Sequence, residues 1–188
     1  MTQAIIDYFK HTWKQTELDQ HVIQCMKQAD TILDVGCGFN QYKTYAKPNQ
    51  FFWGIDFANE KADEVIDIID YQTDRDFDLI ICYGSINFHN REWIDRRLEK
   101  VFSLLSPKWE SRICMKVNPG HPHKDGTMLD FYPWTKELAE RIAYVNNFKL
   151  ENMRDGEDGR FKFDLIRPEY PDGYSTLWRE AEDTYSPI

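Results

Sequence analysis

Short runs of apolar residues alternate along the chain with longer segments whose apolar residues recur every three or four positions. The short runs predict strands, because strands buried on both faces of a parallel sheet are continuously hydrophobic. In chain order they cover residues 31–35, 51–56, 65–68, 77–82, 112–117, 148–153 and 161–166. Glycine or proline ends several of these runs, as at Gly36 and at Pro119-Gly120.

The longer segments predict helices. Residues 3–27 carry apolar side chains at helical intervals and predict one or two helices. A second helical pattern over 93–105 is closed by Ser106-Pro107. A further helix begins after Thr135, a residue type that caps helix N-termini well. Its expected inward-facing residues are Leu138, Ile142 and Val145.

Strands and helices therefore alternate until the last two strands, which follow one another. The glycine-rich turn at 155–159 suits a hairpin between them. This order predicts a doubly wound α/β fold: a mostly parallel seven-stranded sheet with a C-terminal antiparallel hairpin strand and helices on both faces. The 188 residues fit a single domain. We expect an N-terminal helical segment (1–29), a Rossmann-like core (30–166) and an irregular tail (167–188).

Charge restricts the class of partner. The formal net charge of -9 argues against a broad phosphate-binding surface, since nucleic-acid affinity depends on Lys and Arg. Around the helix predicted over 93–105 the two signs are intermixed, which favours a solvated face over a nucleic-acid patch. The basic residues of that face are Arg91, Arg96, Arg97 and Lys100.

Cysteine usage and hydropathy predict a cytoplasmic protein without a membrane anchor. No stretch approaches the roughly 20 apolar residues of a transmembrane helix, and the N-terminus lacks a basic region followed by an apolar run. The four cysteines lack CxxC spacing and are interpreted as free buried thiols, so no metal site is expected. They are Cys25, Cys37, Cys82 and Cys114.

A glycine turn follows the first predicted strand. Gly36 and Gly38 let the backbone turn sharply and approach a ligand where side chains would block it. The next strand ends at Asp56, about 20 residues further on, where an acid can accept hydrogen bonds from ribose hydroxyls. A dinucleotide fingerprint needs a third glycine, but Gln41 stands there, at the start of a short and poor helix. The pattern therefore favours a nucleoside cofactor without a pyrophosphate.

The segment Asp34-Val35-Gly36-Cys37-Gly38 resembles the first motif of the class I S-adenosylmethionine-dependent methyltransferases. In that family an acid stands two places before the first of two spaced glycines. The resemblance extends from Thr31 to Ile166 and implies the family's fold, methyl transfer, S-adenosylmethionine as cofactor and S-adenosylhomocysteine as product. Little room for helices remains between Asp56 and Asp78, so the chain resembles a compact version.

The resemblance also implies the cofactor contacts. Asp56 matches the acid that binds the ribose, and Asp67-Ile68 resembles the adenine-side pair, with Asp70 as an alternative. Tyr83-Gly84 falls behind the methionine moiety. The resulting candidates for cofactor binding are Asp34, Gly36, Cys37, Gly38, Asp56, Phe57, Asp67, Ile68, Tyr83 and Gly84.

These roles also make chemical sense. Asp34 can orient the cofactor's ammonium group, and Phe57 can lie against the adenine. Cys37 is interpreted as a small space-filling residue rather than a nucleophile. For Asp67, a cofactor contact and a purely structural place in a turn fit the sequence equally well.

The methyl acceptor is inferred by elimination. The stretch 84–88 lacks the Asp/Asn/Ser-Pro-Pro-aromatic motif of amino-methylating DNA enzymes, and no cysteine follows a proline as in cytosine-C5 enzymes. A small-molecule acceptor is therefore favoured. A nucleic-acid or protein methyltransferase acting with a partner, and a non-catalytic S-adenosylmethionine-binding module, stay open. The substrate-side candidates are Asn87, His89, His121 and His123; no general base and no oligomeric state can be assigned.

Overall fold

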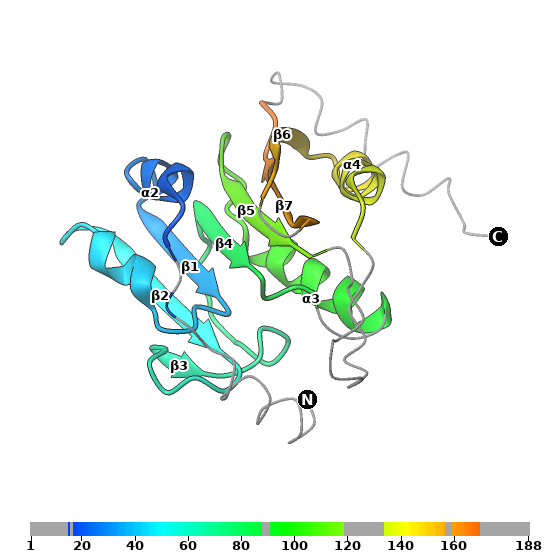
Figure 1. Ribbon diagram of the computed structural model, residues 1–188. Helices are drawn as coiled ribbons and strands as arrows, with labels where there is room; N and C mark the ends of the chain where they lie inside the picture. Colours follow the sequence, from blue (N-terminus) through cyan, green and yellow to red (C-terminus); the bar gives the residue numbers. More distant parts are fainter. Residues whose placement is uncertain (1–14, 16, 88–90, 119–133, 157–158, 170–188) are drawn as a thin grey trace, which may run out of the picture.

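The computed structural model describes residues 15, 17–87, 91–118, 134–156 and 159–169 (Figure 1). Seven strands form one sheet in the order β3-β2-β1-β4-β5-β7-β6. The first five strands pair in parallel, whereas β7 pairs antiparallel with both β5 and β6. The strands are β1 (Thr31–Val35), β2 (Phe51–Asp56), β3 (Glu64–Val65), β4 (Leu79–Tyr83), β5 (Arg112–Val117), β6 (Lys149–Asp155) and β7 (Phe161–Ile166). The predicted sheet with its antiparallel hairpin strand is confirmed.

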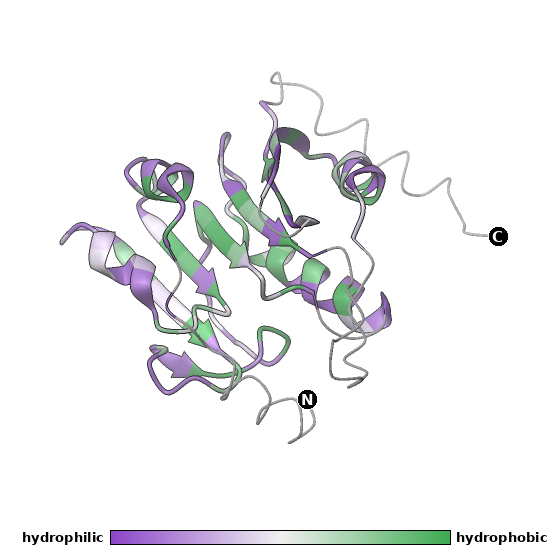
Figure 2. Cartoon of the chain, viewed as in Figure 1, coloured by the Kyte–Doolittle hydropathy of each residue, from purple (hydrophilic) through white to green (hydrophobic). Residues whose placement is uncertain are grey.

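Helices cover both faces of this sheet. α2 (Gln20–Met26) and the 3-10 helix η1 (Gln41–Tyr45) pack on one face, and α3 (Arg91–Leu104) and α4 (Lys136–Val145) pack on the other. Each face has its own cluster of buried apolar residues. Figure 2 shows that the central strands β4 and β5 are mostly hydrophobic, whereas α2 and α3 also carry hydrophilic residues. The sheet thus separates two hydrophobic cores and contributes residues to both.

The strand order reverses between β1 and β4. From β1 the chain moves outward through β2 to β3, then returns to β4 on the other side of β1 and continues to β5. The connections that leave the carboxyl ends of β1 and β4 therefore diverge, which opens a crevice at that edge of the sheet.

Two of the helices have side-chain caps at their N-termini. The Asp19 carboxylate accepts a hydrogen bond from the backbone N–H of His21 at 2.9 Å and caps α2. Thr135 is the N-cap of α4, as predicted, and accepts from the N–H of Leu138 at 3.1 Å. A side-chain cap of this kind contributes about 1 kcal/mol to a helix.

The end of one strand and the buried face of one helix differ clearly from the sequence predictions. β3 ends at Val65 rather than at residue 68, because Asp67 starts a turn in which its carbonyl accepts from the N–H groups of Asp70 and Tyr71. In α4, Ala139 and Ala143 are buried, whereas Val145 is 64% exposed and does not face inward. Leu138 and Ile142 are partly buried and pack against the core, as predicted, so the buried face of α4 is centred on the two alanines and excludes Val145.

Other predictions concern the segments between elements. No α-helix lies between Asp56 and Asp78, a stretch that the structure describes throughout, in agreement with the compact form expected. The predicted helix over residues 3–27 is confirmed only for α2, since residues 3–14 lie outside the described part. Within the described ranges, no helix is long and apolar enough to cross a membrane.

Candidate functional site

Two glycine turns meet at the crevice between β1 and β4. Gly36 has a φ of +71° and Gly84 a φ of +87°, backbone conformations that L side chains rarely adopt. The two turns also touch, because a Cβ placed on Gly36 would lie 2.4 Å from the Cβ of Ser85. Gly36 is therefore required both by its backbone conformation and by the close approach of the β4 turn.

A cavity of about 320 Å³ lies beside these turns, at the carboxyl ends of the central strands. This volume is within the range of small-molecule sites in proteins. All ten residues that the sequence predicted for cofactor binding line it, together with the substrate-side candidate Asn87. His89, His121 and His123 lie outside the described residues, so the structure does not place them.

Asp34 is the most unusual group in this cavity. It is only 3% exposed, and burial, with the nearby charge of Asp56 as a smaller cause, raises the pKa of its carboxyl to about 8. None of the described residues donates a hydrogen bond to its side chain. A buried carboxylate without a partner is costly. The Asp34 carboxylate would therefore be stabilised by a hydrogen-bond donor from a ligand, and most strongly by a positively charged one.

Asp56, the second buried acid, is already part of the turn. One carboxylate oxygen accepts from the N–H groups of Ala58 and Asn59, and the other accepts from the N–H of Gly38, each at 3.0 Å. Burial outweighs these three hydrogen bonds and raises the pKa of Asp56 above its ordinary value. A carboxylate offers about four lone-pair positions, so one, on the oxygen that binds Gly38, is left for a ligand.

Cys37, between the two glycines of the first turn, is held as a thiol. Burial, followed by the charges of Asp34 and Asp56, raises its pKa well above the usual range. Only a thiolate is an effective nucleophile. Its place in the lining therefore fits the space-filling role that the sequence indicated.

Asp67 is paired with a buried arginine. Two guanidinium nitrogens of Arg97 donate to the two carboxylate oxygens, at 2.6 and 3.3 Å, and the N–H of Ile69 donates at 3.2 Å. The prediction that Arg97 belongs to a solvated face is wrong, since it is 3% exposed. Arg97 falls on the inward stripe of α3 with Ile94 and Val101, and the ion pair makes its burial possible. These contacts favour the structural interpretation of Asp67, although both residues line the cavity.

The part of the cavity lined by Asn87 is held by a chain of asparagine contacts. Asn87, after β4, is 1% exposed, and its side-chain carbonyl accepts from the N–H of Asn118 at 3.1 Å. The side-chain carbonyl of Asn118 in turn accepts from Nε of Arg160 at 2.8 Å. The ends of β4 and β5 are thereby tied to the segment just before β7.

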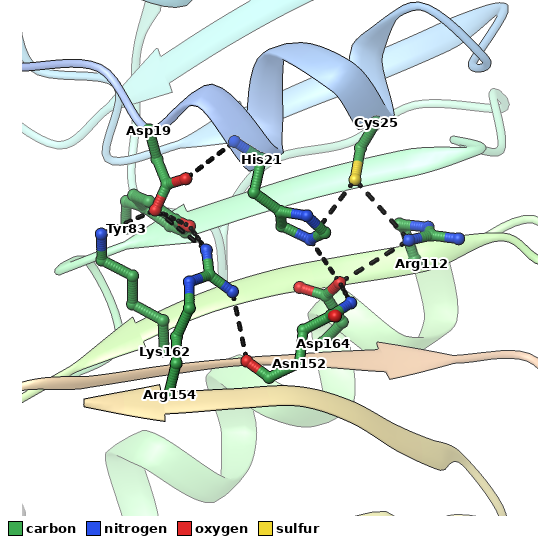
Figure 3. Close-up of polar contacts among 9 residues, drawn as sticks. All are labelled: Asp19, His21, Cys25, Tyr83, Arg112, Asn152, Arg154, Lys162 and Asp164. Atoms are coloured by element: carbon green, nitrogen blue, oxygen red, sulfur yellow. Dashed lines mark hydrogen bonds and ion pairs between the residues drawn. The ribbon is translucent and has the colours of Figure 1, made fainter. Parts of the chain in front are cut away.

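A polar cluster that the sequence did not reveal closes the other side (Figure 3). One oxygen of Asp19 accepts from Lys162 at 2.6 Å, Arg154 at 2.9 Å and the hydroxyl of Tyr83 at 3.0 Å. Although burial acts in the opposite direction, these donors and the N–H of His21 hold the pKa of Asp19 well below its usual range. The sequence analysis did not single out Asp19, whose side-chain partners come from strands more than 60 residues away.

The comparisons with known proteins bear on the fold. No family model and no curated protein sequence matches the chain. Among solved structures, magnesium protoporphyrin IX methyltransferase from Synechocystis, with bound S-adenosylmethionine, is similar with a TM-score of 0.63 and 13% identity, over 87% of this chain and 95% of that one.

Two further structures agree. The 1,6-didemethyltoxoflavin-N1-methyltransferase of Burkholderia thailandensis has a TM-score of 0.61 and 11% identity, over 79% of this chain and 76% of its own. The N-methyltransferase NodS of Bradyrhizobium japonicum has a TM-score of 0.59 and 10% identity, over 89% and 99%. The chain therefore has the fold of the class I S-adenosylmethionine-dependent methyltransferases.

Proposed function

We propose that the chain binds S-adenosylmethionine in the cavity between β1 and β4 and transfers its methyl group to a small molecule. The observation that carries the proposal is Asp34. A buried, unpartnered carboxyl at the end of β1, beside a glycine turn at the topological switch point, matches the ammonium group of the cofactor's amino-acid end.

The remaining lining fits the rest of the cofactor. Backbone groups at Gly36 and Gly38 are free of side chains that would block the amino-acid end. The unused lone pair of Asp56 accepts one ribose hydroxyl. Phe57, Ile66 and Ile68 offer apolar surface to the adenine. Asp67 stays with Arg97 and borders the adenine rather than binding it through a free carboxylate.

In methyl transfer the main task of the protein is to position the acceptor in line with the methyl group of the cofactor. The bound cofactor supplies an electrophilic methyl carbon, which the acceptor attacks as the bond to sulfur breaks and S-adenosylhomocysteine leaves. Asn87 and Asn118 line the part of the cavity that we assign to the acceptor. His89, His121 and His123 lie outside the described residues and stay proposed as substrate-side residues. Orientation and exclusion of water supply the acceleration.

Several features favour a small-molecule acceptor and a cytoplasmic site of action. The similar structures include enzymes named for small molecules, didemethyltoxoflavin and magnesium protoporphyrin. The acidic net charge of -9 opposes a nucleic-acid substrate. All four cysteines are free, as expected in a reducing compartment.

Calorimetry tests the cofactor. S-adenosylmethionine and S-adenosylhomocysteine should bind, and NAD should not. Asp34→Asn should weaken S-adenosylmethionine binding roughly ten- to a hundredfold, since one charge-assisted hydrogen bond is lost. Asp78→Asn is the matched control, because Asp78 lies at the opposite end of the sheet, where it accepts from the N–H of Asp30. Absence of S-adenosylmethionine binding to the wild-type chain overturns the proposal.

Transfer from cofactor labelled in its methyl group then identifies the acceptor class. Label should pass into a metabolite extract rather than into RNA or protein fractions. Label in RNA or protein would replace the small-molecule acceptor with a macromolecular one. Tight cofactor binding without transfer into any fraction would indicate a non-catalytic binding module.

A further inference from the structure

Four metal-ligating side chains meet on the face of the sheet that α2 covers. They are His21 and Cys25 of α2, Cys114 of β5 and Asp164 of β7, and their ligand atoms all lie within 4.8 Å of one another. Figure 3 shows three of them, with the His21 ring pointing from α2 towards Asp164 and Cys25 beside it. The cysteine spacing in the sequence predicted no metal site, because these four residues come from three distant segments.

The backbone places the four residues with little freedom. His21 and Cys25 are four positions apart on one helix and so point in the same direction. Cys114 and Asp164 are directly paired across β5 and β7, and therefore project from the same face of the sheet. The two pairs face one another because α2 packs on that side. Cys25, Cys114 and Asp164 are buried, and the His21 side chain is 27% exposed.

The contacts within the cluster converge on one nitrogen. Nε2 of His21 lies 2.6 Å from the Asp164 carboxylate and 3.5 Å from the Cys25 sulfur. A Cys-His-Asp catalytic relay would place the acid on the other ring nitrogen, Nδ1, so this arrangement is not such a triad. Since Nε2 has a single in-plane position for a proton or lone pair, it cannot bond fully to both neighbours. A shared ion would satisfy all of them.

We propose that His21, Cys25, Cys114 and Asp164 form a structural zinc site. Two sulfurs, one imidazole nitrogen and one carboxylate oxygen are a donor set that favours tetrahedral Zn²⁺. Ligands of such an ion lie about 3.3–3.8 Å apart, given zinc–ligand bonds of about 2.0–2.3 Å. The His21–Asp164 pair has to open by less than 1 Å from its 2.6 Å separation to reach this spacing.

Neighbouring groups fit the charge and orientation that such a site needs. Two thiolates, one carboxylate and Zn²⁺ leave a net charge of about -1. The guanidinium of Arg112 lies 3.6 Å from both the Cys25 sulfur and the Asp164 carboxylate and would balance it. The side-chain amide of Asn152 donates to Asp164 at 2.7 Å and fixes the carboxylate's orientation.

One member of the cluster, Cys25, borders a separate cavity. This second cavity, of about 210 Å³, is lined by Cys25 and Arg112 together with Asp78 and Leu79 at the beginning of β4. It opens at the amino-terminal edge of the sheet, opposite the cavity assigned to the cofactor. Four protein ligands leave no open position, so the ion would pin α2 to β5 and β7 rather than take part in methyl transfer. The site does not depend on the proposed function.

Metal binding can be measured without any assay of activity. The full chain, purified with a reductant and stripped by a chelator, should take up one Zn²⁺ in competition with a chromophoric chelator. Co²⁺ in its place should give thiolate-to-metal charge-transfer absorption. Cys25→Ala and Cys114→Ala should each weaken Zn²⁺ binding roughly a hundredfold or more. Cys82→Ala is the matched control, because Cys82 is buried in β4 and packs in the cluster on the other face.

The test of zinc binding can be interpreted even if one of the cysteine variants does not fold. His21→Gln removes a ligand from a part-exposed position, and circular dichroism reports whether each variant is folded. The wild-type thermal midpoint Tm should rise with Zn²⁺, and this rise should disappear in folded ligand variants. The proposal is overturned if the wild type binds no Zn²⁺, if Cys25→Ala binds it as tightly, or if mass spectrometry finds Cys25 and Cys114 joined as a disulfide under these conditions.

Discussion

At the scale of single residues, Asp34 links cofactor binding to pH. Its carboxyl has a pKa of about 8 in the free protein, so it is mostly protonated at pH 7. Binding of an ammonium group requires the charged form, and complex formation should therefore release about one proton at pH 7. The affinity for S-adenosylmethionine should rise about tenfold per pH unit between pH 6 and 7 and level off near pH 8.

Calorimetry in buffers of different ionisation enthalpy measures this proton release directly. Asp34→Asn cannot titrate, so its weaker binding should be nearly independent of pH over the same range. A pH-independent affinity in the wild type would show that Asp34 does not receive the ammonium group.

Gly36 and Gly38 provide a second test, because their surroundings differ. Both have positive φ, at +71° and +52°, but an added Cβ meets Ser85 at 2.4 Å only at position 36 and finds no atom within 4 Å at position 38. Gly38→Ala should lower the free energy of unfolding by about 1–2 kcal/mol, the cost of left-handed backbone. Gly36→Ala should cost clearly more, because the turns of β1 and β4 must separate. Urea unfolding of both variants checks the difference; equal losses would contradict the close approach.

At the scale of elements, the ion pair of Arg97 and Asp67 joins α3 to the loop after β3. Arg97→Met would leave Asp67 without its principal partner, and the free energy of unfolding should fall by about 3 kcal/mol. Arg96→Met is the matched control: Arg96 is exposed one position earlier, so its loss should cost less than about 0.5 kcal/mol. Urea unfolding distinguishes the two, and similar small losses would mean that the pair does not hold this loop.

The elements differ in how far sequence determines them. β1, β2, β5 and β7 were predicted with the bounds they have, because each is an apolar run with a clear stop. β3 was predicted to end three residues too late, since apolar Ile66 and Ile68 serve the cavity and the core rather than a strand. Arg97 could not be recognised as buried, because its ion-pair partner Asp67 lies 30 residues away in the sequence. The ten cavity residues could be predicted because they lie in or near short sequence motifs at strand ends, whereas the Asp19 cluster and the proposed zinc ligands depend on tertiary contacts between distant segments.

At the scale of the whole molecule, α2 connects two sites on opposite edges of the sheet. Its N-cap Asp19 and Tyr83 of β4 line the cavity proposed for the cofactor. Its other end contributes Cys25 to the cavity at the amino-terminal edge. The docking of this one short helix therefore supports both the proposed cofactor site and the proposed zinc site.

Asp34 and Asp19 give the free protein an unusual dependence of stability on pH. The pKa of Asp34 is raised from 3.8 to about 8, so between these values the folded chain holds a proton that the unfolded chain has lost, and stability falls as pH rises. The pKa of Asp19 is lowered, so its contribution is present above about pH 4 and is lost on acidification. The raised pKa of Asp56, and the self-repulsion of a chain with net charge -9, act in the same direction as Asp34.

The free energy of unfolding of the cofactor-free chain should therefore peak near pH 4–5 and decline towards pH 8, with Asp34 alone contributing up to about 1.4 kcal/mol per pH unit. Urea unfolding across this range measures the curve. Asp34→Asn should flatten the decline, because an amide occupies the buried position at no cost in ionisation. Asp19→Asn should instead lower stability above pH 4, and this loss should shrink only as pH falls below 4 towards the lowered pKa of Asp19. A wild-type maximum at pH 7 or above, or a decline that Asp34→Asn leaves intact, would show that Asp34 is ionised in the free protein and already has a partner.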